Sequence, residues 1–151
     1  MVYQGAIMAK ALDTHIEINA STETVWQVLI DFSRYGQWNP FIRSIRGEAK
    51  QGEKLEVFIQ PPGGSGMLFR PVILTLKPGG ELRWLGRFLL PGIFDGEHQF
   101  QIEPLGHNRT RFIQREVFSG LLVPFLWSSL SRRTRQGFEE MNRALKMQVE
   151  Q

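Results

Sequence analysis

The sequence contains no cysteine and only three histidines, and its apolar runs are short. The absence of cysteine excludes disulfide bonds, thiol catalysis and cysteine-ligated metals, and it fits the reducing cytoplasm, the location that we expect. The histidines, at positions 15, 98 and 107, have no metal-ligand spacing, so we expect neither a metal nor another cofactor. The longest apolar run, residues 121–127, is far shorter than the roughly 20 residues that span a bilayer. Residues 1–11 also lack the basic and apolar regions of a secretory signal.

Charge of one sign is not in large excess, because 18 basic residues face 15 acidic ones and the net charge is +3. Four arginines, at positions 83, 87, 109 and 111, are expected on one outward sheet face, without the aromatic residues that stack bases. We therefore expect no nucleic-acid partner. The 11 phenylalanines and 4 tryptophans suit a lined cavity as well as a packed core. A chain of 151 residues is one domain's worth, so we expect a flexible arm over 1–11 and a single domain over 12–151, as a monomer or homodimer.

Hydrophobic periodicity predicts an α+β fold. Alternating residues predict strands over 12–19, 42–49, 54–60, 67–77 and 81–90, followed by a hairpin over 94–120. Ser21 is the predicted N-cap of a helix of about three turns, and residues 33–41 are predicted to form a second, short and broken helical piece. Apolar residues three and four apart between Leu126 and Leu145 predict a long amphipathic helix. Gly137 within it marks a close approach to a strand or leaves room for a ligand.

The hairpin over 94–120 places ionisable and bulky apolar side chains on the same face. If its strands pair symmetrically about a turn near Gly106, His98 lies opposite Gln114. Gly96 then lies opposite Glu116. Polar side chains on an apolar concave face must be hydrogen-bonded, hydrated or used by a ligand. The hairpin therefore predicts a pocket with polar anchors.

His98 and Glu116 are the pair best suited to acid–base catalysis, because histidine titrates near neutral pH and a carboxylate can fix its tautomer. A structural histidine, bonded to a neighbouring side chain or water, is the alternative interpretation. A register slip of one residue would turn Glu116 outward and Arg115 inward, where Arg115 could bind an acidic ligand.

Residues 120–130 hold more apolar side chains than one helix face can bury. One interpretation is that this segment plugs the end of a cavity and begins the long helix, with Pro124 in its first turn. The other is a moving lid or a transient membrane contact, with Arg132, Arg133 and Arg135 meeting anionic headgroups.

Four stretches of the sequence carry a resemblance to a known superfamily: IEINASTETVWQVLIDFSRYGQWNPF, FDGEHQFQIEP, TRFIQREVFSGLL and TRQGFEEMNRALK. Their order over nearly the whole chain resembles the START-like (SRPBCC) superfamily, and within it the polyketide cyclase/dehydrase and lipid-transport branch. The resemblance implies the helix-grip fold, a curved antiparallel sheet of about seven strands around the long C-terminal helix, with two short helices after the first strand. It also implies a large cavity between helix and sheet.

The residues expected to line this cavity come from three sources. The resemblance implies an inward-facing set of Trp38, Phe58, Trp84, His98, Phe100, Phe112, Glu116, Phe138 and Met141. Alternation along the hairpin adds Gln114 and Phe118, and the apolar segment adds Phe125.

We therefore expect a cofactor-free protein that binds, and possibly transports or sequesters, a hydrophobic or amphipathic small molecule or lipid, rather than an enzyme. One alternative is a cyclase or dehydratase acting on a polyketide-like or other apolar substrate, with His98 and Glu116 moving protons. A second alternative is a protein-interaction module like the Hsp90-activator relatives of the fold, which requires a small or closed cavity and an exposed apolar patch.

Overall fold

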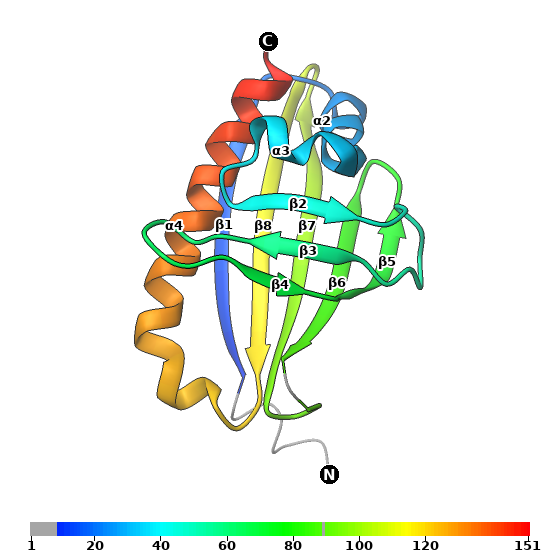
Figure 1. Ribbon diagram of the computed structural model, residues 1–151. Coiled ribbons are helices and arrows are strands. Elements are labelled where there is room, and N and C mark those ends of the chain that lie inside the picture. The colour runs from blue at the N-terminus through cyan, green and yellow to red at the C-terminus, as the bar shows by residue number, and fades with distance from the viewer. Residues whose placement is uncertain (1–8, 89) are drawn as a thin grey trace.

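The computed structural model describes residues 9–88 and 90–151 (Figure 1). The first strand, β1 (Lys10–Ile18), starts two residues before the expected domain, and its first two residues already pair with β8 (Arg109–Ser119). Residues 1–8 of the expected arm lie outside the described residues.

In the described residues, the strands form two antiparallel sheets that cross one another (Figure 1). Sheet A contains five strands in the order β1-β8-β7-β6-β5, and sheet B contains three in the order β2-β3-β4. The remaining bounds are β2 Ile42–Arg46, β3 Glu56–Ile59, β4 Met67–Phe69, β5 Val72–Lys77, β6 Glu81–Phe88 and β7 Phe94–Gly106. The α+β helix-grip prediction is confirmed, with two sheets in place of a single sheet of about seven strands.

The single strand expected over 67–77 is divided between the two sheets as β4 and β5. Pro71 lies at the break, and it has no N–H to donate to a strand ladder. Its carbonyl accepts a hydrogen bond from Leu55 N at 2.8 Å. The chain therefore leaves sheet B and enters sheet A at this proline.

Two short helices follow β1, as expected. The first, α2 (Thr22–Ile30), begins after Ser21, whose Oγ accepts a hydrogen bond from Thr24 N at 3.2 Å. A 3-10 turn, η1 (Phe32–Arg34), leads into α3 (Tyr35–Trp38). Asn39 then ends the segment, because its Oδ1 accepts hydrogen bonds from two backbone N–H groups at the start of β2.

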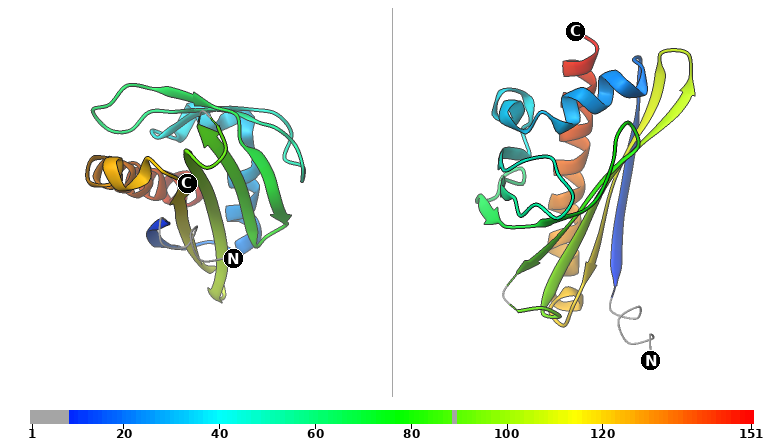
Figure 2. Two further views of the ribbon diagram at one scale, coloured as in Figure 1. Left: turned by 90° about the horizontal axis from the view of Figure 1, so that it is seen from below. Right: turned by 90° about the vertical axis from the view of Figure 1, so that its right-hand side faces the viewer.

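The long helix, α4 (Val123–Val149), has Pro124 in its first turn and packs against β1, β8 and α2. The side views show it running along the space between the two sheets (Figure 2). Gly137 lies under the ring of Phe41, since a Cβ at position 137 would be 2.2 Å from Phe41 Cδ1. The close approach predicted at this glycine is therefore to the loop before β2 and not to a strand.

The arginines expected to make the outer face of sheet A basic are paired with acidic residues. The pairs are Arg83 with Glu81 and Glu97, Arg87 with Asp95, Arg109 with Glu17, and Arg111 with Glu103. Arg115 pairs with Asp13 across β8 and β1, so the register slip that would turn Arg115 inward does not occur. The outer face alternates in charge and is not a basic surface.

Candidate functional site

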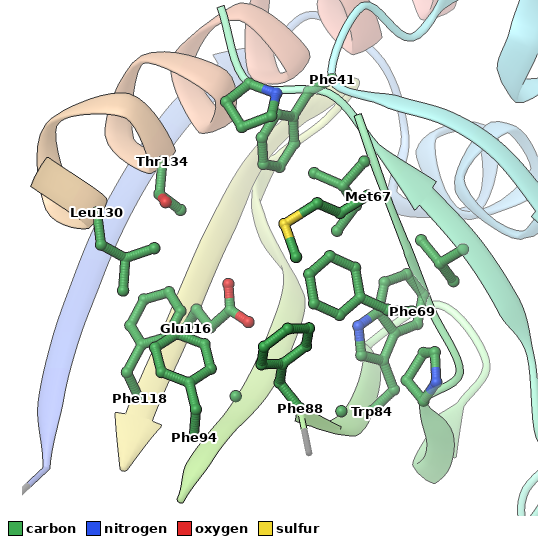
Figure 3. A pocket seen from close by; sticks show the side chains of 16 residues that line it. Phe41, Met67, Phe69, Trp84, Phe88, Phe94, Glu116, Phe118, Leu130 and Thr134 are labelled. Atoms are coloured by element: carbon green, nitrogen blue, oxygen red, sulfur yellow. The ribbon is translucent and has the colours of Figure 1, made fainter. Parts of the chain in front are cut away.

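A pocket opens between the inner face of sheet A, sheet B and the first half of α4 (Figure 3). It holds about 770 Å³ of space free of protein atoms, its open mouth included. The lining residues are Phe41, Val57, Ile59, Pro61, Met67, Phe69, Pro71, Trp84, Gly86, Phe88, Phe94, Gly96, Glu116, Phe118, Leu130 and Thr134.

The pocket exists because one row of inward positions on sheet A has glycine on two of its three strands. Gly86 on β6 pairs with Gly96 on β7, and Gly96 pairs in turn with Phe118 on β8. The next row, Trp84–His98–Glu116, is filled with large side chains. The floor of the pocket is therefore a pair of glycines bordered by aromatic rings.

Glu116 is the one charged residue of this lining, and its carboxylate points into the middle of the pocket (Figure 3). The side chain is 17% exposed, and Oε2 lies 3.5 Å from His98 Nδ1. Oε1 lies over Gly96, because a Cβ at position 96 would be 2.6 Å from that oxygen. Any larger residue at position 96 would therefore displace the carboxylate.

His98 is 1% exposed and lies behind Glu116, outside the pocket lining. Its ring stacks on Phe100 with centroids 4.4 Å apart and also contacts Trp84 and Phe138. Glu116 is thus the member of the pair that a ligand can reach, and His98 supports it from the core.

A buried chain of hydrogen bonds holds His98 from the other side. His98 Nε2 lies 2.9 Å from Gln114 Oε1, and Gln114 Nε2 donates to Asn142 Oδ1 at 2.8 Å. Asn142 Nδ2 donates to Thr14 Oγ1, which donates to the carbonyl of Gln114. Gln114 Nε2 also points at the carbonyl of Phe138, which can accept but not donate. The oxygen of Gln114 therefore faces His98, so His98 carries a proton on Nε2.

The predicted pairing of the hairpin was wrong by two residues. His98 lies opposite Glu116, and Phe100 lies opposite Gln114. The turn is centred on His107 and Asn108 and not on Gly106, because Asn108 takes the left-handed conformation at φ 51°. Gly106 ends β7 after a shift in register. The corrected register brings His98 and Glu116 together.

The structure places the predicted lining residues in three groups. Trp84, Glu116 and Phe118 line the pocket. His98, Gln114, Phe100, Phe112, Phe138 and Met141 face the same side but are buried in the closed half of the fold, with no surface toward the pocket. Trp38, Phe58 and Phe125 lie elsewhere.

These last three residues lie outside the pocket for separate reasons. Phe58 alternates with the pocket residues Val57 and Ile59, so it points to the other face of sheet B, where its ring covers Gly66. Trp38 packs against Tyr35 with centroids 5.0 Å apart. Phe125 is 82% exposed, so it neither lines the pocket nor plugs it.

The sequence analysis missed the walls that sheet B and α4 contribute. Met67 and Phe69 come from β4, and Leu130 and Thr134 come from α4. The spacing of Leu130 and Thr134 by four residues put both on the predicted inner face of the long helix, which was a usable signal. For Val57 and Ile59 on β3, which also line the pocket, the usable signal was the alternation along residues 56–60.

Residues 9–88 and 90–151 contain no cluster of three or more histidine, cysteine, aspartate or glutamate side chains that could hold a metal ion. No helix in this part of the chain is both long and apolar enough to cross a membrane.

The chain is similar in structure to several solved proteins. A START superfamily protein from Mycobacterium smegmatis has a TM-score of 0.74 at 23% identity, and the match covers 93% of this chain and 97% of the other. The Zhui aromatase/cyclase from a Streptomyces species has a TM-score of 0.74 at 14% identity over 94% of both chains. Norcoclaurine synthase from Thalictrum flavum, in complex with dopamine and hydroxybenzaldehyde, has a TM-score of 0.71 at 13% identity over 99% of this chain and 94% of the other.

At these identities the structural likeness establishes the fold alone. A comparison with curated protein sequences finds no match. The Hsp90-activator alternative gains no support from any of these comparisons. A family model described as polyketide cyclase / dehydrase and lipid transport matches residues 10–150, nearly the whole described chain. The chain therefore belongs to this family, within the START-like (SRPBCC) superfamily.

Proposed function

We propose that this protein binds a hydrophobic or amphipathic small molecule in the pocket, for transport or sequestration. The observation that carries the proposal is a concave, largely apolar lining with a single carboxylate, Glu116, near its centre. Apolar walls supply affinity by removing ligand surface from water, and a few polar groups fix its orientation. The family description, which joins lipid transport to cyclase chemistry, supports a ligand of this class. The cytoplasmic location and the monomeric or dimeric state stay predictions from the sequence.

Gly86 offers a way to fill the pocket from its floor. A Cβ at position 86 would have no neighbour nearer than 3.9 Å, and the backbone there does not have a positive φ. The substitution Gly86→Leu therefore puts an isobutyl group into the pocket. Lys77→Leu adds the same side chain at an exposed position of β5 and is the matched control.

The test is a fluorescence titration with N-phenyl-1-naphthylamine, a neutral apolar probe. We expect the wild type and Lys77→Leu to bind it with similar Kd. Gly86→Leu should weaken binding roughly 10-fold or more, because the leucine side chain occupies space that the probe needs. Overpacking of this kind costs about 1–3 kcal/mol of binding free energy. Equal binding by all three proteins would place the probe outside the pocket and contradict the proposal.

We also propose that ligands exchange with anionic lipid surfaces at one end of the molecule. The exposed apolar residues there, Leu90, Leu121, Leu122, Phe125 and Leu126, are called the apolar tip. The turn after β6 and the start of α4 meet at this end (Figure 1), joined by a hydrogen bond from Leu121 N to Gly92 O of 3.0 Å. Residues 119–138 contain three arginines and no acidic residue, so the charge around the tip complements anionic headgroups.

Co-sedimentation with phosphatidylglycerol/phosphatidylcholine vesicles tests this contact. Phe125→Ser should reduce vesicle binding several-fold, because Phe125 is the most exposed apolar residue of the tip. Met147→Ser is the control, since Met147 is 70% exposed on the same helix but lies near its other end. A wild-type protein that stays in the supernatant, or a Phe125→Ser variant that binds as well as Met147→Ser, would contradict the contact.

A second candidate function is acid–base catalysis of the cyclase or dehydratase kind, and the Glu116–His98 pair supports it. Glu116 would be the catalytic base, and His98 a positioning residue, because His98 does not face the pocket. The probe reaction is the ring opening of 5-nitrobenzisoxazole, in which the base takes the C3 proton as the N–O bond breaks to give the cyanophenolate. A rate above that of free acetate, lost in Glu116→Gln while probe binding remains, would support catalysis. A rate unchanged in Glu116→Gln would exclude Glu116 as the base.

A further inference from the structure

The pocket carries one acid–base pair, Glu116 with the buried His98, and the hydrogen bonds behind His98 decide which of its ring nitrogens holds a proton. Because Gln114 presents its oxygen to His98, the proton on the ring is committed to Nε2. In neutral His98, Nδ1 then has only a lone pair, and it faces Glu116 Oε2 at 3.5 Å. Two lone pairs facing each other in a buried site repel, whereas one proton between them satisfies both groups.

One proton shared between Nδ1 and Oε2, as imidazolium with carboxylate or as imidazole with carboxylic acid, would satisfy both groups and leave the pair with no net charge. The surroundings of His98 add no charge, because its ring contacts Trp84, Phe100 and Phe138. The described residues that line the pocket add none either, apart from Glu116 itself.

The second oxygen of the carboxylate, Oε1, lies over Gly96 at the edge of the pocket floor. Its partner Oε2 is the oxygen that His98 approaches, so Oε1 is left as a hydrogen-bond acceptor toward the pocket. A ligand that fills the apolar walls and covers this acceptor without donating to it would bury an unpaired polar group, which is costly.

We propose that the pocket selects neutral, mainly apolar molecules that carry one O–H or N–H donor, and that it rejects carboxylates. This inference rests on the proposed function and names the ligand class for the same site. A carboxylate would face Oε1 with lone pairs and no proton to donate, and it would have to give up its water without a net positive charge to receive it. An ammonium group would have to give up its water without a net negative charge to receive it, because the pair is neutral.

The test compares four molecules of similar shape by displacement of N-phenyl-1-naphthylamine at neutral pH. They are 2-naphthol, 2-methoxynaphthalene, 2-naphthoate and 2-naphthylmethylamine. We expect 2-naphthol to bind roughly 10-fold or more tightly than 2-methoxynaphthalene, which has the same ring but no donor. The anionic and cationic members should bind more weakly than 2-naphthol.

Two variants assign this preference to Glu116. Glu116→Leu should bring 2-naphthol and 2-methoxynaphthalene to similar affinity, because the acceptor is gone. Glu116→Gln keeps an amide oxygen in the pocket and an N–H for His98 Nδ1. It should therefore retain part of the preference for 2-naphthol over 2-methoxynaphthalene. This variant replaces Glu116→Leu in the test if the leucine variant does not fold. Equal affinities of 2-naphthol and 2-methoxynaphthalene for the wild type would overturn the inference while leaving the proposed function intact. Binding of none of the four would overturn both.

A separate measurement tests the tautomer of His98 without a ligand. Long-range ¹H–¹⁵N NMR spectra of the imidazole rings report which nitrogen carries the proton. We expect His98 Nε2 to be protonated in the wild type and in Glu116→Gln. A neutral ring protonated on Nδ1 would refute the tautomer and with it the inference.

Discussion

The buried chain Thr14–Asn142–Gln114–His98 should contribute strongly to stability, and Gln114→Leu tests it. Gln114 is fully buried, and its amide is the link between His98 Nε2 and Asn142 Oδ1. Leucine has a similar volume but no polar atoms. The substitution therefore leaves a histidine N–H and an asparagine oxygen without their partners in the core.

The size of the effect follows from these two groups. Each buried group left without its hydrogen bond costs about 1–3 kcal/mol, so the two together cost about 2–6 kcal/mol. Burying the apolar side chain of leucine offsets about 1–2 kcal/mol of this. The difference spans about 0–5 kcal/mol, and we expect the free energy of unfolding to fall by about 2–3 kcal/mol, near the middle of that range.

The assay is urea unfolding followed by tryptophan fluorescence. Gln101→Leu, on the neighbouring strand β7 at a half-buried position of the other face, is the control and should change the free energy of unfolding by less than about 0.5 kcal/mol. The double variant Gln114→Leu/Asn142→Leu should lose less free energy of unfolding than the two single variants added together. In each single variant the remaining polar side chain loses its partner, whereas in the double variant both of these polar side chains are gone. A Gln114→Leu protein as stable as the control would refute the hydrogen-bond chain, and with it the tautomer assigned to His98.

Two further predictions concern the packing around the pocket. Gly137→Ala should lower the free energy of unfolding in urea by about 1 kcal/mol, although alanine favours a helix, because its methyl group would collide with the ring of Phe41. The control, Ser129→Ala on the exposed face of the helix, should lose no stability. A Gly137→Ala protein more stable than the wild type would contradict the packing. Tyr35 is fully buried with its hydroxyl bonded to Leu29 O, and burial raises the pKa of this hydroxyl. The free energy of unfolding should therefore fall as pH rises above about 10, where tyrosine ionises in the unfolded chain. Tyr35→Phe should lose less stability than the wild type between pH 9 and pH 11, and equal losses would contradict this assignment.

The face of sheet A that bears the site could be predicted from alternation alone. Along residues 94–119 every second side chain points inward, and Glu116 and Phe118 were placed on the pocket side from this pattern, whereas Trp84 was expected there from the family resemblance. The exact pairing could not be predicted, because it depends on which two residues form the turn. Gly106 has a positive φ of 138°, but it ends β7, and the turn falls on His107 and on Asn108, which has φ 51°.

The limits of the pocket could not be predicted, because they depend on contacts between distant elements. His98 and Phe100 share a face with Glu116, but α4 covers them by way of Phe138 and closes that half of the fold. Phe125 is apolar, which suggested burial, yet it lies on a helix end that no other described element covers. Hydrophobicity predicts that a residue is suited to burial and does not say which partner will bury it.

The central claim is that ligands bind between the two sheets and the first half of α4, and nuclear Overhauser effects measure it most directly. Protein with labelled isoleucine and leucine methyl groups would be mixed with 2-naphthol. We predict contacts from the ring to the methyl groups of Ile59 and Leu130, which line the pocket. Contacts confined to Leu121 and Leu126 on the apolar tip, or no contacts at saturating 2-naphthol, would contradict the claim.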